Sequence, residues 1–278
     1  MNLVIQSNHA IPSTHLDHIA GLAQTGLTEK ISPHAYRLSG AQPHPEIAPY
    51  CLKNRLDCGF VPRGLSLKDF GLVVMDMDST LISIECIDEI ADMQGLKPQV
   101  AAITEAAMRG EMDFAESLRR RVALLEGLDE QALQRVYDER LKLNPGAEIM
   151  LAQFKQHGIK TLLVSGGFLF FTERLKPRLG LDHTHANTLE IVDGKLTGRV
   201  LGKILDAQGK ADWLVKIREE LELKPAQVIA MGDGANDLKM MAMAGISIAY
   251  HAKPVVREQA SYALNFVGLD GLVNLLAN

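Results

Sequence analysis

Two aspartates stand one residue apart at the end of a short apolar run, and this spacing is suited to metal chemistry. Residues 73–75 are apolar, Asp76 and Asp78 come next, and the hydroxyl residues Ser79 and Thr80 follow. The apolar run is typical of a buried strand, and the loop after such a strand is where ligands bind in open α/β sheets. Two carboxylates this close repel each other unless a cation lies between them. Because Mg²⁺ prefers oxygen ligands, the pair predicts a magnesium site.

A third carboxylate has an equivalent place later in the chain. Asp233 follows the predicted strand 227–231, which is apolar from Val228 onward, and is flanked by glycines that allow a tight turn. Parallel strands end at the same edge of a sheet, so Asp76 and Asp233 are expected to share one Mg²⁺. A carboxylate in such a site can also act as a nucleophile. The alternative, in which Asp76 and Asp78 only cap a turn, is disfavoured by the apolar strands before Asp76 and Asp233.

Three other polar positions are suited to holding a phosphate. Residues 165–167, Ser-Gly-Gly, follow the apolar run 161–164 and offer a hydroxyl and backbone N–H groups at the start of a helix. Lys210 opens an amphipathic helix and supplies a positive charge. Asp237 follows Asn236 in the first turn of another helix, where it could hold a metal-bound water, orient Lys210 or cap the helix. Each has an ordinary alternative, namely a plain turn, a solvated lysine or a helix cap.

The predicted elements fall into three parts. From residue 145 onward, strands and helices alternate, which is typical of an α/β fold with a parallel sheet covered on both faces. Residues 85–144 show only helical patterning and are too long for a simple crossover, so they are predicted to form an inserted helical cap. Residues 67–84 and 145–278 then make up the core. Residues 1–66 are predicted to form a small α+β region.

Composition narrows the function classes. Hydrophobic residues make up 47% of the 278 residues, enough for a substantial core, and the formal net charge is −5. Without a stripe of Lys and Arg, nucleic acid is not an expected partner. No apolar stretch is long enough to cross a membrane. The three cysteines are odd in number and lack Cys-x-x-Cys spacing, which favours a reducing compartment. We therefore expect a soluble, cytoplasmic protein.

Taken in order, these motifs resemble those of the haloacid dehalogenase superfamily of phosphohydrolases, and within it the phosphoserine phosphatase family. The resemblance covers about residues 70–275. The segments that carry it are residues 76–80, residues 165–167, Lys210 and residues 232–237. It implies a three-layer Rossmannoid core with a helical cap inserted after the first strand. The helical patterning at 85–144 independently predicts such a cap.

The resemblance also implies catalytic roles. Asp76 would attack the phosphorus atom and form a phosphoaspartyl intermediate. Asp78 would protonate the leaving serine oxygen and then activate water. Mg²⁺ would be bound by the carboxylates of Asp76 and Asp233 and by the backbone carbonyl of Asp78. Asp78 also argues for turnover rather than a lasting phosphoaspartate signal, because a nearby acid/base group makes the intermediate transient.

Substrate choice is implied by residues of the predicted cap. Glu85, nine residues after Asp76, would face the substrate ammonium, and Arg121 would grip the carboxylate in a bidentate pair. The residues implied to surround the phosphate are Ser165, Gly166, Lys210 and Asn236. The implied reaction is Mg²⁺-dependent hydrolysis of O-phospho-L-serine to L-serine and phosphate, the last step of serine biosynthesis. Another small phosphate ester and a receiver-like binding module are the alternatives.

The N-terminal region is the least determined part of the sequence. An ACT-like unit and a truncated ferredoxin-like unit both fit its length. Structural support and dimerisation are the alternative roles for this region. Whether the chain forms a homodimer, whether serine exerts feedback and whether the cap is open or closed stay undetermined from the sequence.

Overall fold

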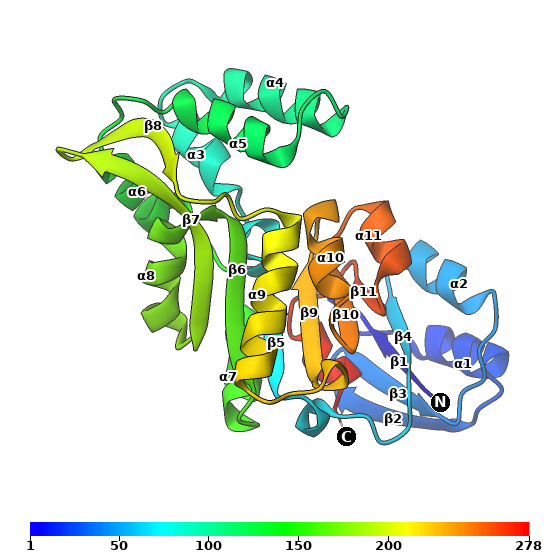
Figure 1. Ribbon diagram of the computed structural model, residues 1–278. Helices are drawn as coiled ribbons and strands as arrows, with labels where there is room; N and C mark the ends of the chain where they lie inside the picture. The colour runs from blue at the N-terminus through cyan, green and yellow to red at the C-terminus, as the bar shows by residue number, and fades with distance from the viewer. Residues whose placement is uncertain (278) are drawn as a thin grey trace.

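The computed structural model describes residues 1–277, which form two separate sheets and a helical layer above one of them (Figure 1). The N-terminal sheet has four strands and the larger sheet has seven. The larger sheet occupies the centre of the molecule, the helical layer lies beyond one end of its strands, and the N-terminal unit lies beside it. The parallel α/β fold predicted from the sequence is confirmed.

The N-terminal unit has the element order βαββαβ, that of ferredoxin-like folds. Its elements are β1 (Asn2–Gln6), α1 (Ser13–Leu22), β2 (Leu27–Ser32), β3 (Ala35–Ser39), α2 (Ile47–Lys53) and β4 (Asp57–Val61). The sheet order is β2-β3-β1-β4, and all pairs are antiparallel. The sequence patterns at 3–5, 16–23, 35–38 and 46–56 predict β1, α1, β3 and α2, whereas no pattern predicts β2 or β4. The edge strand β2 buries no residue, so it lacks the apolar pattern that identifies a strand.

The seven-stranded sheet carries the strand ends where chemistry was expected. Its order is β11-β10-β9-β5-β6-β7-β8, with every pair parallel except β7 with β8. The strands are β5 (Leu72–Met75), β6 (Lys160–Phe168), β7 (His183–Val192), β8 (Lys195–Leu201), β9 (Val228–Gly232), β10 (Ile246–Tyr250) and β11 (Tyr262–Leu264). The Asp193-Gly194 dipeptide predicts the tight turn of the β7–β8 hairpin, and both residues have positive φ there.

Helices cover both faces of this sheet, and the side chains of β5 show why. Val73 and Met75 belong to one apolar cluster, whereas Leu72 and Val74 belong to the cluster on the opposite face. The helices on the first face are α7 (Ala147–Gln156), α8 (Leu169–Leu179) and α12 (Gly271–Leu275). Those on the second face are α9 (Ala207–Glu220), α10 (Leu238–Met241) and α11 (Pro254–Gln259). The result is the three-layer core that the sequence predicted.

The helical layer follows β5 directly, as the sequence predicted. Its helices are α3 (Cys86–Asp92), α4 (Lys97–Met108), α5 (Phe114–Ala123), α6 (Gln131–Arg135) and a π-helical turn η3 (Val136–Arg140). Asp113 caps α5, because its side chain accepts a hydrogen bond from the Glu116 N–H at 2.8 Å. The β7–β8 hairpin reaches up to this layer. Leu196 exchanges backbone hydrogen bonds with Gly127 and Leu128, both 2.8 Å long.

A buried carboxylate joins the N-terminal sheet to the β11 edge of the larger sheet. Asp57, the first residue of β4, accepts backbone hydrogen bonds from Asn265, Phe266 and Val267 at 2.8, 2.8 and 3.0 Å. The Asn265 side chain donates a fourth bond at 3.1 Å. The hydroxyl of Tyr262 also donates to the Phe60 carbonyl across this junction. These contacts tie the two sheets together.

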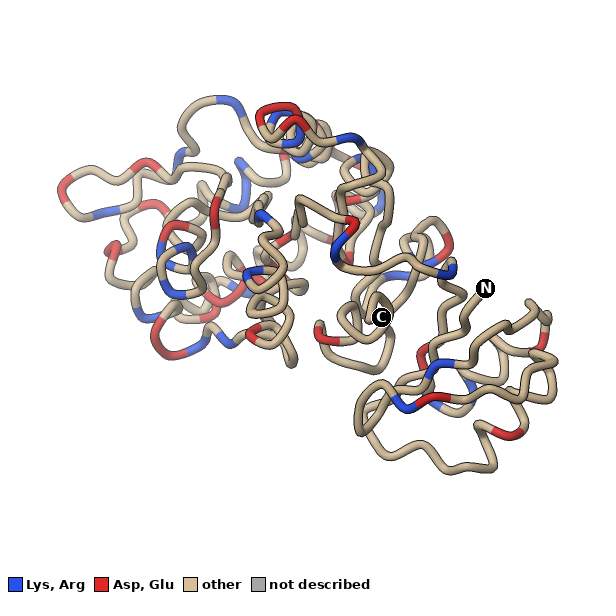
Figure 2. The backbone as a smooth tube through the Cα atoms, turned by 90° about the horizontal axis from the view of Figure 1, so that it is seen from below, with Lys and Arg blue, Asp and Glu red and all other residues tan. Residues whose placement is uncertain are grey.

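Charged residues of both signs occur along the described chain (Figure 2). Lys and Arg segments alternate with Asp and Glu segments along the backbone in Figure 2. Across residues 1–277, no helix combines the length and the apolar character that a membrane crossing demands.

Candidate active site

Adjacent strands bring the predicted site residues to one edge of the sheet. Strand β5 lies between β9 and β6, and Met75 is in register with Met231 and Leu163. Asp76, at the end of β5, and Asp233, just beyond β9, therefore end up side by side. The convergence of these strand ends, which the sequence could only suggest, is present in the structure.

The segment after β5 is wound into an irregular turn, η2 (Met77–Leu81), rather than a plain loop. Ser79 has a φ of +57°, in the left-handed region. Asn144, where the chain returns from the helical layer, donates to the carbonyls of Thr80 and Ile82 at 2.7 and 3.1 Å. The turn is thus fixed by a residue that is 62 to 64 positions away in sequence, which no local pattern revealed.

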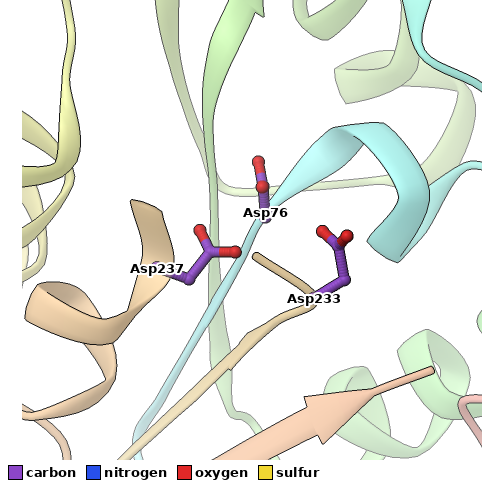
Figure 3. A group of neighbouring side chains, drawn as sticks. All are labelled: Asp76, Asp233 and Asp237. Carbon is purple, nitrogen blue, oxygen red and sulfur yellow. The ribbon is translucent and has the colours of Figure 1, made fainter. Parts of the chain in front are cut away.

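Three carboxylates gather beneath the turn (Figure 3). One oxygen of each of Asp76, Asp233 and Asp237 lies within 4.8 Å of the others. Lys210 is only 1% exposed, and its Nζ pairs with Asp76 Oδ1 at 2.7 Å and with Asp237 Oδ1 at 2.8 Å. Of the three roles considered for Asp237, the structure shows both the pairing with Lys210 and the cap, because Asp237 also caps the short helical turn η5 (Ala235–Asp237). The Gly234 N–H donates to the other Asp237 oxygen at 3.1 Å.

The protonation of these groups reflects crowded negative charge. Burial, and then Asp237, raise the pKa of Asp76 well above its usual range. Burial raises the pKa of Asp233 to about 6, and burial and the Glu85 charge raise that of Asp78 to about 7. Burial would lower the pKa of Lys210, but Asp237 and Asp76 raise it instead, so Lys210 stays charged. The single ammonium of Lys210 does not balance the negative charges of these carboxylates. Carboxylate oxygens are hard donors, and they fit a divalent cation such as Mg²⁺.

The phosphate segment differs from its prediction in one respect. The strand does not stop at Val164, because β6 continues to Phe168 and α8 begins only at Leu169. Ser165 and Gly166 therefore lie in irregular extended chain, where the register with β7 shifts, and not at the first turn of a helix. The Ser165 hydroxyl accepts a hydrogen bond from the Gly167 N–H at 2.9 Å.

Two structural features hold this segment in place. Asn187 of β7 is 3% exposed, donates to the Gly166 carbonyl at 2.8 Å and accepts from the Leu205 N–H at 2.7 Å. A side chain at Gly167 would place its Cβ 2.6 Å from Asp78 Oδ2, so Asp78 would have to move. Sequence reasoning did not find Asn187, because it lies inside a strand pattern with no motif around it.

A cavity of about 480 Å³ opens above these groups, between the sheet edge and the helical layer. The predicted site residues that line it are Asp76, Asp78, Glu85, Arg121, Ser165, Gly166, Asp233 and Asn236. Lys210 and Asp237 lie beneath its floor and are fully buried. Lining residues that the sequence reasoning did not single out include Asp88, Phe114 and Lys253.

The helical layer supplies both charged groups expected at the amino-acid end. The Ser79 hydroxyl donates to Glu85 Oε1 at 2.6 Å, and Arg121 lies on α5. Desolvation lowers the pKa of Arg121, although the charges of Asp88 and Glu85 act against this. The Cys86 N–H donates to Asp78 Oδ1 at 3.2 Å. The helical layer thus contacts Asp78 through its first helical residue.

Comparison with known proteins decides the family. A family model described as haloacid dehalogenase-like hydrolase matches residues 73–242. A phosphoserine phosphatase of Polaromonas sp. is 56% identical over 217 residues, which are 76% of this chain and 92% of that protein. The chain belongs to the haloacid dehalogenase-like hydrolases. It is an enzyme of this family, and its relatives place it in the phosphoserine phosphatase branch, as the motifs had indicated.

Solved structures of this hydrolase family support the same assignment. A family hydrolase from Salmonella enterica has a TM-score of 0.89 at 35% identity, over 100% of this chain and 99% of the other. A probable phosphoserine phosphatase from Vibrio cholerae has a TM-score of 0.87 at 40% identity, over 99% and 86%. A second family model, a domain of unknown function, matches residues 3–47 of the N-terminal unit.

Proposed function

We propose that this hydrolase removes the phosphate from O-phospho-L-serine, giving L-serine and phosphate. The observation that supports this best is the division of the cavity: Asp76 and Ser165 lie at its floor, while Glu85 and Arg121 come from the helical layer. A phosphomonoester dianion suits the floor beside a divalent cation, and an α-amino acid carries the two charges that a carboxylate and a guanidinium would bind. Several relatives bear the name phosphoserine phosphatase.

In the proposed reaction, Asp76 is the nucleophile. Lys210 and the Met77 N–H both bond to its Oδ1, so we assign the attack on phosphorus to Oδ2. As the bond from phosphorus to the serine oxygen breaks, Asp78 gives that oxygen a proton. Its raised pKa, about 7, suits a group that must hold a proton at neutral pH. Asp78 then takes a proton from water, which attacks the phosphoaspartate and releases phosphate.

Mg²⁺ bound by the carboxylates of Asp76 and Asp233 and the Asp78 carbonyl would supply the positive charge that phosphoryl transfer requires. Lys210, held by Asp237, keeps a permanent positive charge below the phosphate. Ser165 and Gly166 offer a hydroxyl and a backbone N–H to the phosphate oxygens, with Asn236 beside them. These groups act mainly by position and charge, because phosphoryl transfer asks for little other chemistry.

Three wider assignments belong to the same proposal. Residues 67–84 and 145–278 act as the catalytic core, 85–144 as its cap and 1–66 as an ACT-like N-terminal α+β region. The enzyme would work in the cytoplasm, at the last step of serine biosynthesis. A homodimer is compatible with the exposed edge strand β2, in which four of six residues are exposed.

The decisive test compares two substrates in two proteins. Phosphoserine carries a carboxylate, whereas phosphoethanolamine lacks it but keeps the ammonium and the phosphate. We expect the wild-type enzyme to prefer phosphoserine by about a hundredfold in kcat/KM, and Arg121→Met to remove most of this preference. Arg119→Met, an exposed neighbour on the same helix, is the matched control and should keep it. Equal rates on both substrates in the wild-type enzyme would point to another phosphate ester.

A further inference from the structure

The charges at the floor of the cavity leave the phosphate end without a surplus of positive charge. Asp76, Asp233 and Asp237 bring three negative charges, and Lys210 brings one positive charge that is already paired with two of them. A divalent cation would only bring this set to neutrality. An ionised Asp78 beside it would make the sum negative. A phosphate dianion approaching from solvent therefore needs another cation at the mouth of the cavity.

Of the described residues, the cations that line the cavity are Arg121 and Lys253. They belong to opposite sides. Arg121 is on the cap, where the negative charges that act on it most strongly are those of Asp88 and Glu85. Lys253 comes from the core, in the loop after β10, and its charge acts on Asp233. Arg121 is thus placed for the amino-acid end and Lys253 for the phosphate end.

The backbone that carries Lys253 is fixed from both sides. The Lys253 N–H donates to the carbonyl of Asp233 at 3.1 Å, so the lysine is tied directly to the residue expected to hold the metal. Two residues earlier, the His251 N–H donates to the Leu264 carbonyl at 2.8 Å. Ala252 between them is 8% exposed and packs in the core. Lys253 itself is exposed, so a fixed backbone presents this residue to solvent.

We propose that Lys253 is a substrate-binding residue that receives the phosphate group of the incoming substrate and holds the phosphate product before release. This rests on the proposed phosphatase function and adds a cation to the phosphate end of the same cavity. Because Lys210 is buried and doubly paired, it acts only on phosphate already seated above Asp76. Lys253 would act earlier, at the mouth of the cavity, and over a longer range.

The test replaces the charge and leaves the backbone hydrogen bond intact. We expect Lys253→Met to raise KM for phosphoserine about tenfold, and to weaken inhibition by inorganic phosphate by a similar factor, while kcat changes less than about twofold. Lys253→Arg should restore both constants to within about threefold of wild type. Lys68→Met removes an exposed lysine far from the cavity and is the matched control. Because salt screens this attraction, the difference between wild type and Lys253→Met should shrink at about 0.5 M NaCl.

Direct binding of inorganic phosphate, measured by calorimetry with Mg²⁺ present, separates this proposal from the proposed function. If the wild-type enzyme binds phosphate and Lys253→Met binds it about tenfold more weakly, the proposal holds even where phosphoserine is not the substrate. Unchanged phosphate affinity and unchanged KM in Lys253→Met would overturn it. It would equally be overturned if Lys253→Arg were as impaired as Lys253→Met, because the role would then depend on shape rather than charge.

Discussion

The floor of the cavity and the junction between the two sheets are both built around a buried aspartate. Asp76 is 4% exposed and Asp57 is 2% exposed. Burial raises the pKa of both side chains, but their partners differ. Asp57 accepts four hydrogen bonds from neutral N–H donors, which compensate a buried carboxylate. Asp76 is surrounded by other carboxylates and shares a single ammonium with Asp237.

This difference separates a structural carboxylate from one kept ready for chemistry. At the junction both carboxylate oxygens of Asp57 accept two hydrogen bonds each, so neither oxygen is left to attract a ligand. At the cavity floor the donors are fewer than the charges require, and within residues 1–277 the Asp233 carboxylate accepts only a long bond of 3.4 Å from the Thr80 hydroxyl. Such a shortage costs stability and is relieved by a bound cation. Substitutions at the cavity floor should therefore affect catalysis, and substitutions at the junction should affect stability.

The largest effect is expected from Asp76→Asn. The amide has the shape of the carboxylate but is a poor nucleophile, so phosphate release from phosphoserine should fall by ~10⁴-fold or more. The melting temperature should stay the same or rise, because one of the crowded charges is gone. Steady-state phosphate release and thermal unfolding measure the two quantities. An Asp76→Asn protein that turns over normally would remove the proposed mechanism.

Metal removal should have the next largest effect. EDTA is expected to lower the rate by at least about a hundredfold, and Mg²⁺ should restore it, whereas the larger Ca²⁺ should not. Mg²⁺ should also raise the melting temperature, because it binds only the native carboxylate cluster. Asp233→Asn is the matched control, and its melting temperature should no longer respond to Mg²⁺. Full activity in EDTA would mean that the crowded carboxylates serve no metal.

At the junction, the effect should fall on stability instead of catalysis. Asp57→Ala leaves three buried backbone N–H groups without their acceptor, which should lower the free energy of unfolding by about 3 kcal/mol or more. The value of kcat should stay within about twofold while the protein is folded. Urea unfolding and phosphate release give the two numbers. Asp17→Ala, at an exposed position of α1, is the control and should cost less than about 0.5 kcal/mol. A folded Asp57→Ala protein without activity would show that the junction shapes the cavity.

The sequence was sufficient to predict the side of this contrast that carries chemistry. Asp76 and Asp233 stand in short motifs at the ends of apolar strands, and the β5 and β9 patterns are the short continuous runs typical of buried strands. Lys210 stands near the start of an amphipathic helix. The helical layer was visible because its helices carry their own caps, such as Asp113. Local pattern and motif order were enough wherever the signal lay within a few residues.

What the sequence could not reveal are the contacts between distant segments. Asp57 stands at the start of a strand that was not predicted, and its partners lie about 208 positions later. Asn187 and Asn144 hold the phosphate segment and the turn after β5, yet each is a single polar residue without a motif. The strand β6 was ended too early because glycines usually mark a turn, whereas here they continue in extended chain. In each case the tertiary contact, and not the local pattern, sets the role.

The smallest effect concerns the weak bond on Asp233. Thr80→Val keeps the shape of a residue that is 1% exposed but removes the hydroxyl that donates over 3.4 Å. A bond of this length adds little, so the concentration of Mg²⁺ giving half-maximal activity should rise by less than about threefold. Titrating Mg²⁺ at saturating phosphoserine measures it.

Thr172→Val is the control for this change, because Thr172 is equally buried but lies on α8 and donates only to the Leu169 carbonyl. The contrary outcome is that Thr80→Val raises the Mg²⁺ concentration for half-maximal activity by about tenfold or more while Thr172→Val does not. In that case the Thr80 hydroxyl fixes Asp233 as firmly as the backbone N–H groups fix Asp57. The contrast between the two regions would then lie in the number of negative charges and no longer in the supply of donors. If the Mg²⁺ requirement of Thr80→Val rises by less than about threefold, the metal ion, and not the hydroxyl, is the partner that compensates the charge of Asp233.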